Sequence, residues 1–174
     1  MTASLPDLPG IRFTGLVYRA LKTIWHREPL SGEGARRHGG RFNRKGQAAL
    51  YTSCDVQTAL AEAAQLGRPL QPTTLVSYAA DIAPVFDATD PAATAKAGFA
   101  ADELTASDWR LQMLSTGASS GQRIADRLIA DGFRALLVPS FARSTSPGGR
   151  NLVMWDWRGS LTVHDDEGRL NPQS

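Results

Sequence analysis

Residues 29–62, PLSGEGARRHGGRFNRKGQAALYTSCDVQTALAE, pass from a polar, glycine-rich run through an apolar run to a pattern typical of a helix. The apolar run at 48–52, AALYT, has the length and composition of a strand. A helix over 55–66 follows, for which either Ser53 or Asp55 can be the N-cap residue. Loop, strand and helix in quick succession indicate a domain that mixes helices and strands.

The rest of the chain continues this alternation, without an internal repeat or a low-complexity linker. An amphipathic helix begins at Ser119 or Ser120, and a shorter helix is expected near 108–114. Two polar, glycine-rich segments, 31–40 and 141–150, are expected to be loops. Because loops beside strand ends commonly carry functional groups, these two are where a site is expected. Further strands are predicted at 15–20, 73–82, 85–87, 134–138 and 151–157.

The length of 174 residues, with a mass of 18.7 kDa, fits one domain. Its core is expected over about 15–160, with peripheral termini. The apolar share of 42% and the charged share of 21% are those of an ordinary folded protein. The predicted fold class is therefore α+β, in a single compact mixed domain.

The charge balance is nearly even, with 19 Lys and Arg against 17 Asp and Glu and a net charge of +2. This excess is too small to predict wrapping of nucleic acid or attraction to a membrane. Aromatic residues make up 7% of the chain and are not interleaved with basic residues as in single-strand binders. We expect neither direct nucleic-acid binding nor membrane association. Nearly all the cations are arginine, which suits an anionic ligand, although a codon bias explains this choice equally well.

Cys54 is the single cysteine, which excludes an intramolecular disulfide and a zinc site built on cysteine pairs. The histidines, His26, His38 and His164, lie far apart in the sequence, so no metal site is expected. No basic segment followed by an apolar run opens the chain, and no apolar stretch approaches the ~18 residues of a membrane helix. A cytoplasmic location is expected.

Several common enzyme motifs are missing from the sequence. Residues 32–37, GEGARR, begin like a dinucleotide-binding fingerprint but lack its third glycine and the apolar helix that would follow. The chain also has no Walker-type Gly-Lys-Ser/Thr, no His-Glu-x-x-His and no Gly-x-Ser-x-Gly. The families that depend on these motifs are thereby excluded.

Four groups of short motifs occur in order between residues 17 and 157, over most of the chain. They are VYR at 17–19, PLSG at 29–32 with GGRFN at 39–43, LYTS at 50–53 with ALAE at 59–62, and VPS at 138–140 with NLV at 151–153. Together they resemble the RES-domain family, named for its Arg, Glu and Ser, whose members are the toxin halves of bacterial toxin–antitoxin pairs. The segment 29–62 is the most specific part, because each motif alone would occur by chance.

The resemblance implies a fold akin to that of ADP-ribosyltransferase toxins, with a cleft that binds NAD⁺. It also implies cleavage of the nicotinamide glycosidic bond, with NAD⁺ as the substrate and no metal. The implied partner is a cognate helix-turn-helix antitoxin that blocks the cleft. Phe42 stands where family members often have tryptophan, which is a conservative departure. The motif positions of the family correspond to Arg19, Arg41, Tyr51, Glu62 and Ser140.

The two arginines and the glutamate have side chains that suit NAD⁺ chemistry. Guanidinium groups hold a pyrophosphate through bidentate, charge-assisted hydrogen bonds, so Arg19 and Arg41 are predicted to bind it. Glu62 falls just beyond the apolar face of the predicted helix, where it can line a cleft. Its carboxylate would stabilise an oxocarbenium-like transition state, orient a hydroxyl group or assist as a general base. The structural alternatives are solvent-facing side chains on a helix and at a strand edge.

Tyr51 and Ser140 are predicted to contact the substrate. Tyr51 can stack on the cationic nicotinamide ring, and the alternative is a core tyrosine with a bonded hydroxyl. The hydroxyl of Ser140 can bond a ribose, a phosphate or Glu62, and the alternative is a turn serine. No histidine is placed to activate Ser140, so it is not predicted to be a nucleophile. The predicted catalytic residues are Glu62, Arg41 and Tyr51, and the predicted NAD⁺-binding residues are Arg19, Arg41, Tyr51 and Ser140.

The predicted function is that of a type II toxin that depletes NAD⁺, as a glycohydrolase or a phosphorylase. A mono-ADP-ribosyltransferase that modifies a cellular protein would use the same residues, and a non-catalytic nucleotide-binding module is a further alternative. The antitoxin is expected to bury the cleft entrance, to compete with NAD⁺ and to contact the 31–40 loop with its Arg36, Arg37 and His38. A solvated loop is the alternative explanation of these basic residues.

Overall fold

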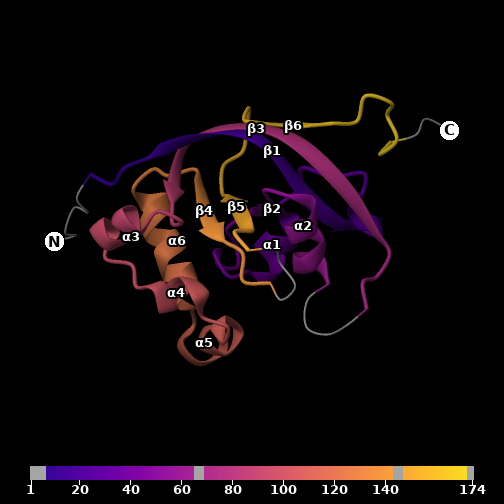
Figure 1. Ribbon diagram of the computed structural model, residues 1–174. Coiled ribbons are helices and arrows are strands. Elements are labelled where there is room, and N and C mark those ends of the chain that lie inside the picture. The colour runs from indigo at the N-terminus through magenta and orange to yellow at the C-terminus, as the bar shows by residue number, and fades with distance from the viewer. Residues whose placement is uncertain (1–6, 65–68, 143–146, 172–174) are drawn as a thin grey trace.

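The computed structural model describes residues 7–64, 69–142 and 147–171 (Figure 1). Within these residues, a curled sheet is packed against short helices, which confirms the predicted α+β class. The strands are β1 (Ile11–Lys22), β2 (Leu50–Ser53), β3 (Thr73–Asp87), β4 (Ala135–Pro139), β5 (Arg150–Met154) and β6 (Leu161–Val163). The helices are the 3-10 helix η1 (Thr23–Trp25), α1 (Glu33–His38), α2 (Val56–Ala63), α3 (Pro91–Ala97), α4 (Ala101–Thr105), α5 (Trp109–Thr116) and α6 (Ser120–Ala130).

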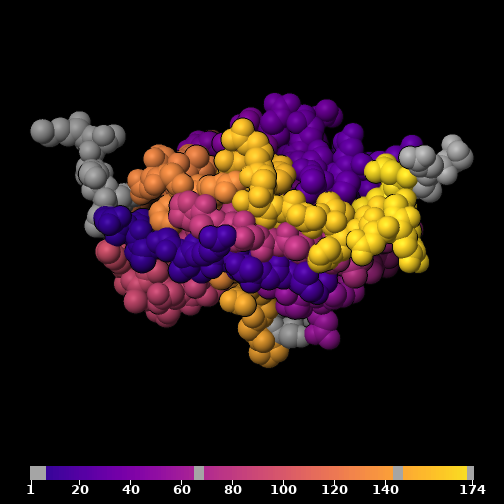
Figure 2. All heavy atoms as spheres, turned by 90° about the horizontal axis from the view of Figure 1, so that it is seen from above, coloured from indigo at the N-terminus to yellow at the C-terminus, as the bar shows by residue number. Residues whose placement is uncertain are grey.

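The sheet closes on itself because its first strand has two neighbours. The strand order is β1-β2-β5-β4-β3-β6, and β1 also pairs with β3 along nearly its whole length. All pairings between these strands are antiparallel except that of β3 with β4. Figure 2 shows β1, β3 and β6 side by side across one face of the molecule. A closed sheet has an inner and an outer face, and successive side chains of a strand enter them alternately.

The two faces of the sheet bury separate apolar clusters. The inner cluster takes side chains from all five strands of the closed ring. The outer face is covered by α3, α4 and α6, and there Phe86 meets Phe99 edge to face at a centroid distance of 5.5 Å. Strand β5 shows the alternation, since Leu152 belongs to the inner cluster and Val153 to the outer one. Successive residues of a strand therefore face the inner and the outer cluster in turn.

Two helix caps expected from the sequence are present. The Asp55 carboxylate accepts hydrogen bonds from the backbone N–H and the hydroxyl of Thr58, at 2.8 and 2.7 Å, and begins α2. Ser119 Oγ accepts from the N–H of Gln122 at 3.2 Å, and Gln122 Oε1 accepts from the N–H of Ser119 at 3.1 Å, which together begin α6. The predicted end of the first helix, near residue 66, lies outside the described residues.

The prediction of a loop over 31–40 is wrong for its middle part, which forms α1. The carboxylate of Glu33 binds Arg36 at 2.7 Å and Arg37 at 2.8 Å, one turn further along the helix. The acid lies in the first turn and the bases in the last, which is the order that the helix dipole favours. These ion pairs offset the low helix propensity of Gly34, which had favoured a loop.

Two features are missing from the described part of the chain. None of its helices combines the length and the apolar character needed to cross a membrane. Nor do three or more His, Cys, Asp or Glu side chains within those ranges gather in a way that could hold a metal ion.

Candidate active site

Four neighbouring strands place one residue each in a row across the outer face of the sheet. Tyr18 of β1 lies opposite Ser53 of β2. Asn151 of β5 lies opposite Ser53 on one side and opposite Val138 of β4 on the other. Residues directly opposite each other point to the same face, and Val138 belongs to the outer cluster. The row therefore forms a floor on the outer face, with two polar side chains at its centre.

Glu62 reaches this floor from α2, which packs against β1 and β2. Its Oε1 atom accepts two hydrogen bonds, from Ser140 Oγ at 2.7 Å and from Asn151 Nδ2 at 2.6 Å. The Oδ1 atom of Asn151 accepts in turn from Ser53 Oγ at 2.8 Å. Two donors that converge on one carboxylate oxygen hold it in a single orientation.

Ser140 is placed by the pairing of β4 with β5. Its N–H donates to the carbonyl oxygen of Gly149 at 2.8 Å, which extends that pairing past Pro139. Ser140 comes two residues after Val138, so it faces the same side of the sheet. Of the three partners expected for its hydroxyl, the structure shows Glu62.

Arg41 supplies positive charge to the site. Its guanidinium carbon lies 5.7 Å from the ring centre of Phe141, and its charge interacts with that of Glu62. Burial lowers the pKa of Arg41, the charge of Glu62 opposes this effect, and Arg110 adds to it. The Nη1 atom is buried and has no hydrogen-bond partner among the described residues. A buried donor without an acceptor costs ~1–3 kcal/mol, and more when it is charged, so this atom is a candidate contact for an anionic ligand.

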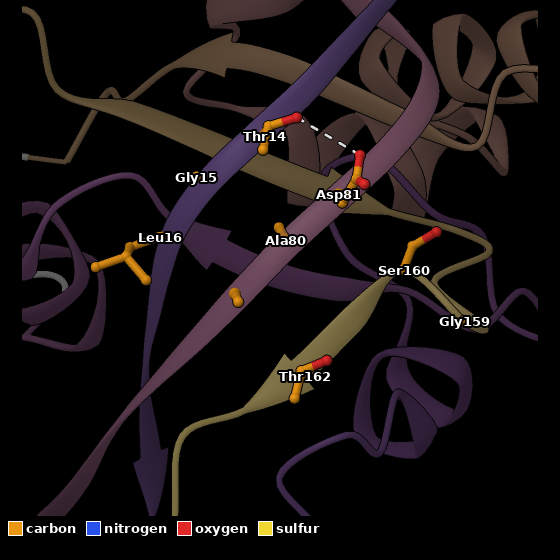
Figure 3. Close-up of a pocket in the computed structure, with 9 residues that line it drawn as sticks. Thr14, Gly15, Leu16, Ala80, Asp81, Gly159, Ser160 and Thr162 are labelled. Atoms are coloured by element: carbon orange, nitrogen blue, oxygen red, sulfur yellow. Dashed lines mark hydrogen bonds between the residues drawn. The ribbon is translucent and has the colours of Figure 1, made fainter.

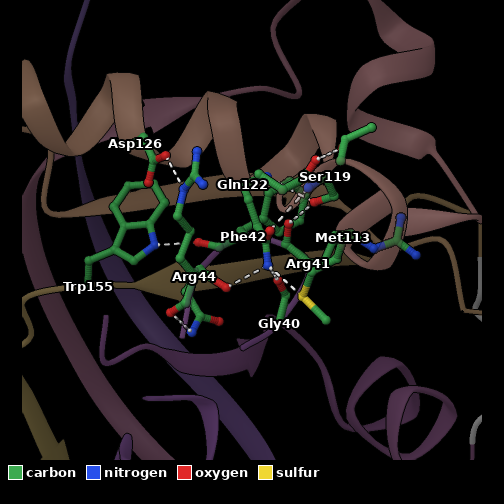
Figure 4. A network of polar contacts seen from close by, with 12 residues as sticks. Gly40, Arg41, Phe42, Arg44, Met113, Ser119, Gln122, Asp126 and Trp155 are labelled. Carbon is green, nitrogen blue, oxygen red and sulfur yellow. Dashed lines mark hydrogen bonds and ion pairs between the residues drawn. The ribbon is translucent and has the colours of Figure 1, made fainter. Parts of the chain in front are cut away.

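The backbone of segment 40–43, which carries Arg41, is held by buried side chains (Figure 4). Gln122 of α6, which is 1% exposed, donates from Nε2 to the first and last carbonyl oxygens of the segment, at 2.9 and 3.0 Å. Trp155 Nε1 donates to the carbonyl oxygen of Phe42 at 2.8 Å. Since these buried groups are matched with partners, the segment has one well-defined conformation.

The hydroxyl of Tyr51 belongs to the same network. It accepts from the N–H of Phe42 at 3.0 Å and donates to Asn43 Oδ1 at 2.7 Å. Burial raises the pKa of Tyr51 well above its ordinary value. A Cβ atom at Gly40 would lie 2.5 Å from this hydroxyl, so the close approach requires glycine. The bonded hydroxyl is the core arrangement named above as the alternative, and stacking on nicotinamide stays a prediction.

Arg19 takes part in a different set of contacts. Arg19 comes two residues after Val17 in β1, and Val17 belongs to the inner cluster. The side chain of Arg19 therefore also starts from the inner face of the sheet. Its Nη1 atom donates to the carbonyl oxygens of Ser31 at 3.1 Å and Pro29 at 3.4 Å, and Tyr78 donates to the latter at 2.7 Å. Burial lowers the pKa of Arg19. The side chain thus fastens the segment before α1, and its contact with pyrophosphate stays a prediction.

A sequence model described as RES domain matches residues 16–171. The chain belongs to the RES domain family. Among solved structures, a chain of the crystal structure of the M. tuberculosis MbcT–MbcA toxin–antitoxin complex resembles this RES domain protein, with a TM-score of 0.66 and 24% identity. The match covers 90% of this chain and 84% of that chain, and shows a shared fold.

The RES resemblance drawn from the sequence is confirmed by the family match, whereas the likeness to ADP-ribosyltransferase toxins stays a prediction. No curated protein matches the sequence. Of the five RES motif positions, the structure brings Glu62, Ser140 and Arg41 together, and links Tyr51 to them through segment 40–43. Arg19 binds the backbone of 29–31 instead.

Ser53 and Asn151 are connected by hydrogen bonds to Glu62 of the candidate site, although the sequence prediction gives neither a function. Both lie within motifs that carry the family resemblance. The sequence does contain one indication that Asn151 has a polar partner. An amide side chain in the apolar strand NLVM costs free energy unless its hydrogen bonds are satisfied. Its partners could not be inferred, because Ser53 and Asn151 lie 98 positions apart in the chain.

A separate hollow of about 360 Å³ lies where β1, β3 and β6 pair (Figure 3). Thr14, Leu16 and Thr162 are among the described residues that line it, and they include none of the five RES motif positions. Asp81 at its margin forms an ion pair with Arg12 at 2.7 Å. The candidate active site is therefore the region around Glu62 and Arg41, and not this hollow.

Proposed function

We propose that this RES domain protein is the toxin of a type II toxin–antitoxin system and cleaves the nicotinamide glycosidic bond of NAD⁺. One observation carries the proposal. The buried Nη1 of Arg41, without a partner among the described residues, lies in a site whose carboxylate, Glu62, is fixed by two donors. NAD⁺ offers a group for each: an anionic pyrophosphate for the guanidinium, and a ribose that becomes cationic during cleavage for the carboxylate.

In the cleavage step, the electron pair of the C1′–N bond passes to nicotinamide, which leaves as a neutral base. The ribose then has oxocarbenium character, as in glycoside hydrolysis. A carboxylate that is already fixed, like that of Glu62, stabilises this charge without reorganising. An oxygen of water or phosphate forms the new bond to C1′, and for water a proton passes to Glu62 or to solvent. The other product is ADP-ribose or its 1-phosphate.

The remaining RES positions act as substrate contacts in this proposal. Arg41 binds the pyrophosphate. The guanidinium group of Arg19 has five N–H donors, so it can bind the pyrophosphate through other N–H groups while Nη1 keeps its contacts with the backbone of 29–31. Tyr51 stacks on the nicotinamide ring. Ser140 donates its hydroxyl hydrogen to Glu62, and its oxygen accepts a hydrogen bond from a ribose hydroxyl.

We also propose that a cognate antitoxin covers this site, as the toxin–antitoxin complex of the MbcT–MbcA structure makes reasonable for a protein of the same fold. The helix-turn-helix character of that partner and a cytoplasmic location, where NAD⁺ is available, remain our expectations. The contact surface would include α1. Because Glu33 already pairs with Arg36 and Arg37, an acidic group of the antitoxin must compete with Glu33 for these guanidinium groups.

The test is to incubate the purified protein with NAD⁺ and to measure nicotinamide by liquid chromatography. Release without any added protein supports hydrolysis or phosphorolysis, and its dependence on phosphate separates the two. Release that requires cell extract, with transfer of labelled ADP-ribose to a protein, supports the mono-ADP-ribosyltransferase alternative. Tight binding of NAD⁺ in calorimetry without turnover under any of these conditions would refute catalysis and support a non-catalytic binding module.

A further inference from the structure

Asn151 connects Glu62 to the sheet, and the mechanism above gives it no function of its own. Its amide lies between two hydrogen bonds, one accepted from Ser53 at 2.8 Å and one donated to Glu62 at 2.6 Å. Asn151 and Ser53 are directly opposite each other in the pairing of β2 with β5, so the backbone fixes their separation. A chain of three side chains thus runs from the sheet to the carboxylate.

The direction of these hydrogen bonds follows from the chemistry of the three groups. A hydroxyl both donates and accepts, an amide has one end of each kind, and an ionised carboxylate only accepts. The amide of Asn151 therefore presents Nδ2 to Glu62, and Ser53 donates to Oδ1. If the amide were turned over, two oxygens would face each other, and the contact would be repulsive unless a proton lay between them.

We propose that Asn151, oriented by Ser53, is a positioning residue that holds the Glu62 carboxylate in one orientation. The inference rests on the proposed function, because it assigns Asn151 a part in the same reaction. Packing alone does not require an amide here, since β5 presents Val153 to the same face. An aliphatic side chain would avoid the cost of burying a polar group. The contact with Glu62 is what the amide adds.

Other charged groups belong to the elements packed around Glu62. Arg41 faces it from segment 40–43 and attracts its carboxylate. Asp55, on the same helix, is engaged in capping the first turn, and Arg150, at the start of β5, is exposed. Substitutions at Asn151 therefore act on Glu62 while the attraction from Arg41 remains constant.

The decisive variant is Asn151→Asp, which keeps the shape and the contact with Ser53 but places an acceptor opposite Glu62. Two carboxyl groups at this distance cannot both ionise easily, so the pair shares a proton near neutral pH. We expect kcat for nicotinamide release to fall ~100-fold at neutral pH and to recover as the pH rises. The acid limb of the pH profile should move upward until its midpoint lies about two units above neutral pH, because a ~100-fold loss at neutral pH requires this, while KM for NAD⁺ changes less than about threefold.

A matched pair of variants on β2 separates positioning from stability. Ser53→Ala removes the donor that orients Asn151, and a fivefold to tenfold loss of kcat, roughly the value of one hydrogen bond, is expected. Thr52→Val is the control, since Thr52 is equally buried at 3% and its hydroxyl donates to the carbonyl oxygen of Leu152 on the other face at 2.8 Å. It loses a similar bond away from Glu62, so its kcat should stay within about twofold of wild type.

A wild-type pH profile in folded Asn151→Asp would overturn the inference, as would equal losses of kcat in Ser53→Ala and Thr52→Val. A measurement without activity covers the case in which Asn151→Asp does not fold. In isotope-labelled protein, the side-chain amide resonances of Asn151 should move with pH in wild type and should not in Glu62→Gln. Identical behaviour in both proteins also overturns the inference. If wild type releases no nicotinamide but these resonances behave as expected, the proposed function fails and the positioning contact stands.

Discussion

Replacing Glu62 by glutamine removes one negative charge from the centre of the site with almost no change in shape. Oε1 of Glu62 accepts from Ser140 at 2.7 Å and from Asn151 at 2.6 Å. The carbonyl oxygen of a glutamine in the same place can accept both hydrogen bonds. The charge that interacts with Arg41 is lost.

The expected effects on stability and on catalysis differ in size. Two charge-assisted hydrogen bonds become neutral ones, which lowers the free energy of unfolding by about 2 kcal/mol at most. For a chain of this length, that loss corresponds to a fall in Tm of ~4–8 °C. Loss of charge stabilisation in the transition state costs ~3 kcal/mol or more, which is over a hundredfold in kcat. The Kd for NAD⁺ should change less than about threefold, because the contact of Arg41 with the pyrophosphate remains.

The assay measures nicotinamide release for kcat, calorimetry for the Kd of NAD⁺ and thermal unfolding for Tm, with wild type and Glu62→Gln side by side. Glu167→Gln is the control, because Glu167 is an exposed carboxylate that pairs with Arg169 near the end of the described chain. Its kcat should equal that of wild type. A Glu62→Gln variant with wild-type kcat would refute the assignment of Glu62 as the group that stabilises the transition state.

Gly40→Ala should lower Tm and kcat together, because the added methyl group would lie 2.5 Å from the Tyr51 hydroxyl, whereas Gly34→Ala, with nothing within 4 Å, should leave both unchanged or raise Tm. Equal Tm values for the two variants would contradict this. Arg41→Ala should weaken NAD⁺ binding by ~2–5 kcal/mol, at least thirtyfold in Kd by calorimetry, and an unchanged Kd would remove Arg41 from the ligand site. Hydrogen bonds from two arginines one turn along α1 lower the pKa of Glu33 to about 2, so their stabilising effect is complete above its ordinary value of 4.5 and is lost as the pH falls toward 2. An NMR titration of Glu33 should show this midpoint, and a midpoint above 4 would show that the ion pairs do not persist in solution.

Local patterns in the sequence were sufficient where the deciding contact joins residues a few positions apart. Asp55 caps α2 through Thr58, and Ser119 caps α6 through Gln122, so both helix starts could be predicted. The family motifs predicted Glu62 as the carboxylate of the candidate site. They could not show that its oxygen is held by two donors, because those donors come from other strands.

The prediction of a loop over residues 31–40 was wrong because two local effects oppose each other there. Four glycines in this stretch favour a loop, but the ion pairs of Glu33 with Arg36 and Arg37 support a helix. Single-residue propensities do not include such pairwise energies. The strand prediction at 15–20 was too short, since β1 runs over Ile11–Lys22, whereas the stretches predicted at 73–82 and 85–87 join into one strand, β3 (Thr73–Asp87). Their length comes from pairing with each other, which closes the sheet and which neither strand pattern contains.

The sequence alone determined the mixed fold class, limited each of two helix caps to two candidate residues and supplied the residue types for the proposed NAD⁺ chemistry. Only the tertiary structure decided that Ser53 and Asn151 lie opposite each other beneath Glu62, and that Nη1 of Arg41 is buried without a partner among the described residues. The physical reason is that strand register and burial are set by pairing between segments far apart in the chain. A hydrogen bond between residues 98 positions apart leaves no periodic signal in the sequence, because its geometry exists only after the sheet has formed.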